Sequence, residues 1–194
     1  MNECIFETVV TTCAADGAVH VAPMGVRYVG DEVVLKPFRP SRTLDNVLAT
    51  RAAVLNRLTD VRVFAGCVTG RHDWLTLPVD AIGAPAVRLA CAHSHVLLRL
   101  HSVSDDAQRP TLRLARVQEV QHSAFAGFNR AQAAVIEGAV LVSRLHLLPP
   151  EKIEGEMAYL QIAVDKTAGT AEREAWGWLQ QAVALHHAPA RGVA

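Results

Sequence analysis

The residues best suited to chemistry lie in one short stretch, residues 36–56, with the sequence KPFRPSRTLDNVLATRAAVLN. Pro37 and Pro40 predict a turn, because proline fixes its own φ and disfavours helix in the residue before it. Ser41 follows at the position of an N-cap, and the free N–H groups at the start of a helix attract anions. Cationic and hydroxyl side chains gather around this point: Lys36, Arg39, Ser41, Arg42 and Thr43. The stretch predicts either a phosphate site or an ordinary capped helix on the surface.

A second stretch, residues 20–26 (HVAPMGV), places a proline and a glycine inside a predicted strand. Both residues weaken a strand, so their presence calls for a reason. Gly25 would allow a flat ligand to approach the backbone closely, and Pro23 would withhold a ladder hydrogen bond at an edge. A β-bulge at the point where a barrel closes explains the same two residues equally well.

Potential metal ligands occur at alternate positions near the middle of the chain. Alternation along a strand would place one set of residues on a common face: Cys91, His93, His95, Leu97, Arg99 and His101. Thiol and imidazole groups suit zinc and other transition metals. Positions on one face are ~7 Å apart, so that only some of these side chains could share an ion. A solvated strand face with a buried thiol at one end is the simpler interpretation.

Hydrophobic periodicity predicts strands in the first part of the chain and helices in the rest. The predicted strands are 5–12, 19–29, 32–36, 52–56, 89–103 and 111–120, with a helix at 41–50. The segment 60–69 is ambiguous between helix and strand. Three helices are predicted at 129–147, 151–165 and 171–186, the first ending before Pro149 and Pro150. The predicted face of the first helix recurs at three and four residues: Ala133, Ile136, Val140, Ser143 and Leu147. The pattern therefore predicts a mainly β plus α fold, in which an antiparallel meander begins a small barrel (1–125) and a helical region (126–194) follows.

Composition limits the classes of function that the chain can have. The 194 residues are 51% hydrophobic and 20% charged, which suits a folded core. The 19 Lys and Arg balance the 19 Asp and Glu, so no basic field indicates a nucleic-acid partner. We expect no signal peptide and no membrane span. Four scattered cysteines form no CxxC pair, which indicates reduced thiols and a cytoplasmic protein.

Four motifs, in their order and spacing, resemble a known family. They are IFETVVTT, HVAPMGVRY, KPFRPSRTLDNV and FNRAQAAVIEGAVLVSRLHLL. The chain is similar to small FMN-binding flavoproteins of methanogens and one-carbon-metabolising bacteria, whose domain has no known function. These proteins are related to the flavin reductase-like and pyridoxamine-phosphate-oxidase-like split barrels. The resemblance implies an FMN-binding split β-barrel with a C-terminal helical extension, a homodimer, and electron or hydride transfer through FMN.

The resemblance also implies which residues hold the cofactor. It places the FMN phosphate on one group: Lys36, Ser41, Arg42, Thr43 and Asn46. It places the flavin ring beside another, mostly through backbone groups: Pro23, Met24 and Gly25. Asn56 closes the matching block and is expected near the ring or the ribityl chain, with a turn as its alternative role. Glu137 and Arg144 are candidates for the substrate side, and exposed ion pairs are the simpler interpretation of both.

Three functions from different classes remain open at this point. The first is an FMN-dependent oxidoreductase acting on a small-molecule substrate or electron donor, with a link to pterin-dependent one-carbon metabolism implied by the family. The second is a flavin-binding or storage protein without catalysis. The third, less favoured, is a metal-dependent enzyme that uses Cys91, His93 and His95.

Overall fold

Contacts within the computed structural model, which describes residues 4–80 and 83–188, divide the chain into two units. The barrel unit comprises the residues up to Thr59 together with Asp73–Phe125. The helical unit comprises Asp60–His72 together with the residues from Ala126 onward. The segment 60–72, which sequence patterns grouped with the barrel, thus belongs with the helices by its contacts.

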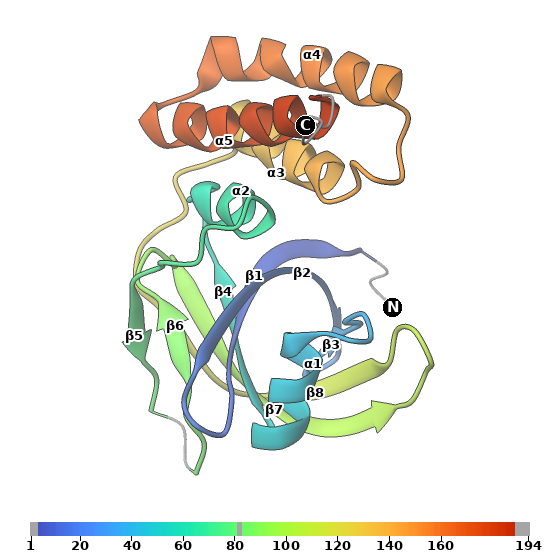
Figure 1. Ribbon diagram of the computed structural model, residues 1–194. Helices are drawn as coiled ribbons and strands as arrows, with labels where there is room; N and C mark the ends of the chain where they lie inside the picture. The colour runs from blue at the N-terminus through green and yellow to red at the C-terminus, as the bar shows by residue number, and fades with distance from the viewer. Residues whose placement is uncertain (1–3, 81–82, 189–194) are drawn as a thin grey trace. The chain divides into compact units, whose positions relative to one another are not determined.

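Six antiparallel strands close the barrel in the order β1-β2-β3-β8-β7-β4 (Figure 1). The strands are β1 (Phe6–Cys13), β2 (Val19–Val29), β3 (Glu32–Leu35), β4 (Ala52–Arg57), β7 (Ser94–Ser104) and β8 (Thr111–Gln121). A separate two-stranded sheet, β5 (Thr76–Pro78) and β6 (Val87–Leu89), belongs to the same unit. The barrel confirms the mixed fold that the sequence predicts.

Alternation along the strands explains how the barrel is filled. Every second residue points inward, and the inward positions carry β-branched and aliphatic side chains such as Val10, Val26 and Val96. Helix α1 (Arg42–Thr50) adds Leu44 and Val47 to the same buried cluster. The helix therefore closes part of the interior, and its start is anchored by packing as well as by its cap.

The long strand expected at 89–103 is wrong in its first part. Strand β6 ends at Leu89, the chain turns through Ala90 and Cys91, and β7 begins only at Ser94. The N–H of Ala92 donates to the carbonyl of Leu89 at 3.2 Å, which closes the turn. A strand requires extended backbone throughout, so Cys91 lies outside β7 and shares no strand face with the histidines that follow.

The helical unit contains α2 (Arg62–Val68), α3 (Arg130–Val142), α4 (Pro150–Thr167) and α5 (Thr170–His187). Helix α2 resolves the ambiguous segment 60–69 and packs against α3 and α5. Among the described residues, no helix is both long and apolar enough to cross a membrane. Figure 1 shows α4 and α5 lying along one another.

Helix α3 differs from its prediction in both length and face. It ends at Val142, and turns rather than helix follow from Ser143 to the prolines. The buried side chains include Ala131, Val135 and Val142, whereas Ala133 is exposed. The buried face of α3 is therefore rotated about the helix axis relative to the predicted face. The reason is that small residues of α3 make its closest contacts with a neighbouring helix.

Gly138 makes that close contact possible, and it provides a prediction. A Cβ at this position would lie 2.8 Å from Cζ3 of Trp176 and 3.1 Å from Cδ1 of Leu179, both on α5. A Cβ at Gly155 in α4 would meet nothing within 4 Å. Both alanine substitutions gain the same helix propensity. The difference in their free energies of unfolding therefore reports the cost of overpacking at Gly138. We expect Gly138→Ala to be less stable than Gly155→Ala by about 1–3 kcal/mol in urea unfolding. Equal stability of the two variants would contradict the close contact.

Candidate functional site

The start of α1 has the geometry of an anion site. Ser41 is the N-cap, as predicted, and its Oγ accepts a hydrogen bond from the N–H of Leu44 at 3.2 Å. The first N–H groups of a helix have no partner within it, so those of Arg42 and Thr43 remain free of helical acceptors. The side chain of Arg42 is exposed, whereas that of Thr43 is buried. The corner therefore offers oriented donors and a mobile cation to a bound anion.

A further cation at this corner, Arg109, was missed by the sequence analysis. It lies in the loop between β7 and β8, where its Nη2 donates to the carbonyl of Lys36 at 3.2 Å. Its guanidinium also lies over the ring of Phe38, 4.4 Å from the ring centre. The N–H of Arg39 donates to the carbonyl of Gln108 at 2.8 Å, which further joins the two loops. Arg109 is far from α1 in the sequence, and only the pairing of these two loops brings it to the start of that helix.

The same loop carries two carboxylates that balance part of the positive charge. Asp105 forms an exposed ion pair with Arg39 at 2.9 Å, a contact of little energetic worth. Asp106 accepts hydrogen bonds from the backbone N–H groups of Arg109 and Gln108. These bonds, with a smaller effect of nearby cations, lower the pKa of Asp106. Asp106 is therefore committed to shaping the loop that presents Arg109.

The edge of β2 that faces this corner is unpaired. Strand β3 pairs with Val26 through its last residue, Leu35, and the chain then leaves the sheet. Beyond that point Gly25, Met24 and Pro23 pair only with β1, on their other side, in the described part of the chain. Register thus brings the predicted ring-binding residues next to the position where Lys36 leaves the sheet. The free edge offers backbone N–H and C=O groups to a ligand.

The two explanations offered for Gly25 both require correction. The pairing of β1 with β2 is regular through Gly25, so no β-bulge occurs there. A Cβ on Gly25 would lie 2.8 Å from Cγ2 of Ile5, so a neighbouring side chain already fills that space. Met24 packs against the barrel core, and its carbonyl accepts a hydrogen bond from Thr8 at 3.0 Å. A ligand at this edge would therefore meet backbone rather than side chains.

Asn46 and Asn56 are both buried and both bond to protein groups. Nδ2 of Asn46 donates to Oγ1 of Thr12 at 3.0 Å. Asn56 is fully buried in β4, where its Nδ2 contacts the carbonyl of Val9 at 3.1 Å and Oγ1 of Thr11 at 3.2 Å. Its Oδ1 accepts from the N–H of Leu89 at 2.8 Å. Asn56 therefore joins β1, β4 and β6. The alternative role of a turn residue is wrong, and the amide is not presented to a ligand.

A cleft of about 700 Å³ occupies one end of the barrel, which we call the barrel mouth. Its lining includes Phe6, Thr8, Tyr28, Arg57, Ser94 and Glu119. None of the residues predicted to bind the cofactor lines it. Sequence patterns do not reveal this site, because these lining residues come from five different strands.

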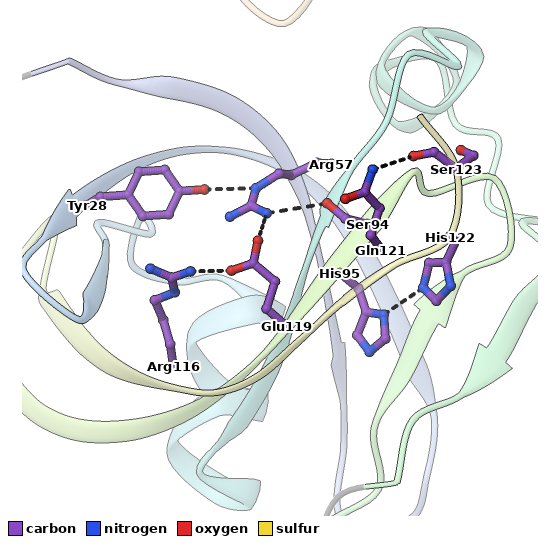
Figure 2. A network of polar contacts seen from close by, with 9 residues as sticks. All are labelled: Tyr28, Arg57, Ser94, His95, Arg116, Glu119, Gln121, His122 and Ser123. Atoms are coloured by element: carbon purple, nitrogen blue, oxygen red, sulfur yellow. Dashed lines mark hydrogen bonds and ion pairs between the residues drawn. The ribbon is translucent and has the colours of Figure 1, made fainter. Parts of the chain in front are cut away.

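Arg57 is the centre of a polar network at the barrel mouth (Figure 2). Its Nε donates to Oη of Tyr28 at 3.3 Å, and Nη1 donates to Oγ of Ser94 at 3.3 Å and to Glu119. Arg116 donates to the other oxygen of Glu119. The bond from Arg57, more than that from Arg116, lowers the pKa of the Glu119 carboxyl. Burial disfavours the charge on Arg57, but Glu119 and Tyr28 outweigh it and raise its pKa.

The histidines considered as possible metal ligands do not gather into a metal site. His93 precedes β7 and bonds to two hydroxyls, those of Thr59 and Ser123, each at 2.7 Å. Nδ1 of His95 lies 2.8 Å from Nε2 of His122. Across the described residues, no group of three or more His, Cys, Asp or Glu side chains is placed to hold a metal ion. The expectation of a shared ligand face is therefore wrong.

His95 predicts a pH dependence of stability. It is buried, its Nε2 has no partner among the described residues, and burial, His122 and Arg88 together lower its pKa from 6.5. A neutral His95 in the folded state contributes stability that is present above pH 6.5 and is lost as the pH falls toward the folded pKa. We expect the urea concentration at the midpoint of unfolding to decrease when the pH is lowered from about 7.5 to about 5. The decrease should be smaller in His95→Gln. An equal fall in both proteins would show that His95 is not responsible.

Known structures share this fold. An FMN-bound DUF447 protein from Methanosarcina mazei is 22% identical, with a TM-score of 0.81 over 93% of this chain and 96% of its own. An FMN-binding protein from Thermus thermophilus, with bound p-hydroxybenzaldehyde, is 13% identical, with a TM-score of 0.53 over 66% and 78%. The 2-nitrobenzoate 2-nitroreductase of Pseudomonas fluorescens is 19% identical, with a TM-score of 0.52 over 60% and 64%. The fold is thus a split β-barrel with a C-terminal helical extension.

Family models match both parts of the chain. The model described as the N-terminal domain of a protein of unknown function (DUF447) matches residues 6–123. A second model, described as a protein of unknown function (DUF447), matches residues 129–181. No curated protein matches the chain. The two matches follow one another in order and together span most of the sequence, so the chain belongs to the DUF447 family.

Proposed function

We propose that this protein is an FMN-binding flavoprotein that transfers electrons or hydride through its flavin. The observation that supports the proposal is the register of β2 and β3, which leaves an edge of β2 unpaired next to the point where the chain leaves β3 toward α1. Helix α1 also contacts β2. A phosphate and a flat ring joined by a flexible chain would find matching groups on these two neighbouring elements. The FMN-bound DUF447 structure from Methanosarcina mazei supports the same cofactor.

The residues present fit the chemistry of FMN. The start of α1 would hold the phosphate through its backbone N–H groups. Positive charge would come from the side chains of Lys36, Arg42 and Arg109. The edge at Pro23 and Gly25 would face the ring with backbone groups. FMN itself supplies the redox chemistry when bound, and the protein supplies binding and orientation. Asn46 and Asn56 would act indirectly, by fixing α1 and β4.

The visible spectrum of the purified protein tests the cofactor. We expect a yellow protein that releases FMN on denaturation, or a colourless one that becomes yellow when FMN is added. A protein that neither contains nor binds FMN would overturn the proposal. Anaerobic reduction of the bound flavin by NADH or NADPH, followed by reoxidation by an acceptor, would separate an oxidoreductase from a storage protein. A flavin that exchanges freely but is reduced by no donor would favour storage.

Two further parts of the proposal concern assembly and surroundings. We propose a homodimer in which two-fold symmetry creates two equivalent sites, supported by the unpaired edge of β2. Light scattering should then give twice the mass of one chain.

We place the protein in the cytoplasm, supported by four cysteines that form no disulfide. A link to pterin-dependent one-carbon metabolism is part of the proposal through the family resemblance, and comparison of pterin with simple acceptors would test it.

A further inference from the structure

At the barrel mouth, polar side chains occupy inward positions. In a small barrel such positions normally carry apolar side chains. In β4, Ala53 and Leu55 belong to the buried core, and Arg57 occupies the next inward position. In β7, Ser94 stands two residues before the core residue Val96. Val96 in turn is paired with Glu119 of β8, and paired residues point to the same side. Three strands thus direct a polar side chain into one cleft.

Such an arrangement destabilises the fold unless other interactions compensate for it. A polar residue at an inward position displaces apolar packing and requires partners of its own. Ligand sites are the usual exception, and the mouths of β-barrels are common places for them. The volume of about 700 Å³ lies within the range of small-molecule sites. The barrel mouth therefore has the size and the inward polar groups of a binding site.

The guanidinium of Arg57 is held in one orientation by groups from three strands. Tyr28 accepts from its Nε, and Ser94 and Glu119 accept from its Nη1. The guanidinium also lies over the ring of Tyr28, 5.7 Å from its centre. Its Nη2 makes no hydrogen bond within the described part of the chain, as Figure 2 shows. A fixed cation with one free donor edge is preorganised to bind an acceptor.

The carboxylate of Glu119 balances the charge of Arg57 only in part. Arg57 and Arg116 share the single carboxylate of Glu119. Glu7 also lines the rim, but alternation along β1 places it on the opposite face from Phe6 and Thr8. Part of the positive charge of Arg57 therefore remains to attract a small anion.

The apolar side of the barrel mouth is aromatic. The rings of Phe6 and Tyr28 meet edge to face, with centres 5.4 Å apart and planes at 65°. Phe6 is 43% exposed, so part of its side-chain surface is available to a third ring. On the polar side His93 is fixed between the hydroxyls of Thr59 and Ser123, which leaves it little freedom to collapse into the cleft.

We propose that the barrel mouth binds a small aromatic carboxylic acid, with the ring against Phe6 and Tyr28 and the carboxylate on Arg57. The site is separate from the corner at α1, and none of the proposed phosphate ligands lines it. It reaches β2 through Tyr28, whereas the free edge of that strand lies at Pro23, Met24 and Gly25. The proposal concerns binding alone and holds whether or not the protein carries FMN.

Calorimetric titration with 2-naphthoate tests the proposal, with 2-naphthamide as the neutral ligand of the same shape. We expect the acid to bind at least roughly tenfold more tightly than the amide, the effect of one charge-assisted contact. In Arg57→Gln the acid should lose this advantage while the amide binds as before. Equal binding of acid and amide, or an unchanged preference in Arg57→Gln, would overturn the proposal.

A second variant keeps the test valid if Arg57→Gln does not fold. Glu119→Gln removes the carboxylate that competes for Arg57 and leaves both arginines in place. We therefore expect it to bind 2-naphthoate more tightly than the wild type, by roughly threefold or more, and 2-naphthamide without change. Weaker binding of the acid by this variant would contradict an anion site.

Titrations with and without saturating FMN separate this proposal from the cofactor assignment. We expect 2-naphthoate to bind in both conditions, because the two sites use different residues. Competition between FMN and 2-naphthoate would show that the probe occupies the flavin corner and would overturn the second site. Failure of FMN to bind, with the acid preference intact, would overturn only the proposed function.

Discussion

Replacing Asn56 with alanine should lower the free energy of unfolding of the barrel unit by about 3–5 kcal/mol. The side chain is fully buried, and it accepts from the N–H of Leu89 and donates toward the carbonyl of Val9. Alanine leaves these groups without a partner in a place that water does not reach, and each unsatisfied buried group costs about 1–3 kcal/mol. The loss is large because one amide joins three strands.

Urea unfolding followed by circular dichroism measures the effect, with Asn46→Ala as the comparison. Asn46 is also buried, but its side-chain nitrogen makes one hydrogen bond, to Thr12. We therefore expect Asn46→Ala to lose about 1 kcal/mol, clearly less than Asn56→Ala. A loss below about 1 kcal/mol for Asn56→Ala would show that the three-strand junction is not a stabilising feature. A loss of FMN affinity with unchanged stability would instead restore Asn56 as a direct flavin contact.

Removing Arg42 and Arg109 together should weaken FMN by about 100-fold or more and leave riboflavin almost unaffected. Each charge-assisted contact with a phosphate is worth about 1.5–3 kcal/mol, and riboflavin lacks the phosphate. Arg42 lies at the first turn of α1, and Arg109 reaches the same corner by its bond to Lys36. The variant therefore separates phosphate capture from ring binding.

Fluorescence titrations of flavin binding give the two affinities, and Arg173→Ala is the matched control. Arg173 is exposed on α5 in the helical unit, so that its loss removes one positive charge from another part of the chain. We expect this control to bind FMN as the wild type does. If FMN and riboflavin weaken equally in the double variant, the phosphate does not bind at this corner. If Arg42→Ala alone has the full effect, Arg109 serves the loop rather than the ligand.

The elements that the sequence predicted correctly depend on short-range interactions. Ser41 caps α1 because its side chain reaches an N–H three residues away. Strand β2 has its predicted bounds, 19–29, because alternation and the flanking turns act within a few residues. The family resemblance also rests on local motifs in order, and the split barrel that it implied is the fold observed.

The errors occurred where a distant contact decides the outcome. Cys91 lies outside the predicted strand because distant groups hold the chain on both sides of it: the N–H of Ala90 donates to the carbonyl of Leu75, and the N–H of His93 donates to that of Arg57. The buried face of α3 was rotated because Trp176 and Leu179 press against Gly138 from another helix. In each case the local pattern allowed two structures, and packing from elsewhere in the unit selected one.

The sequence by itself determined the class of fold and the capped helix, and it predicts the phosphate ligands Lys36, Ser41, Arg42 and Thr43. Only the tertiary structure brought Arg109 to that corner, committed Asn56 to a three-strand junction and assembled Arg57 with Glu119 at the barrel mouth. The physical reason is that propensity and capping act over a few residues, whereas strand register and loop pairing bring together groups more than 30 residues apart.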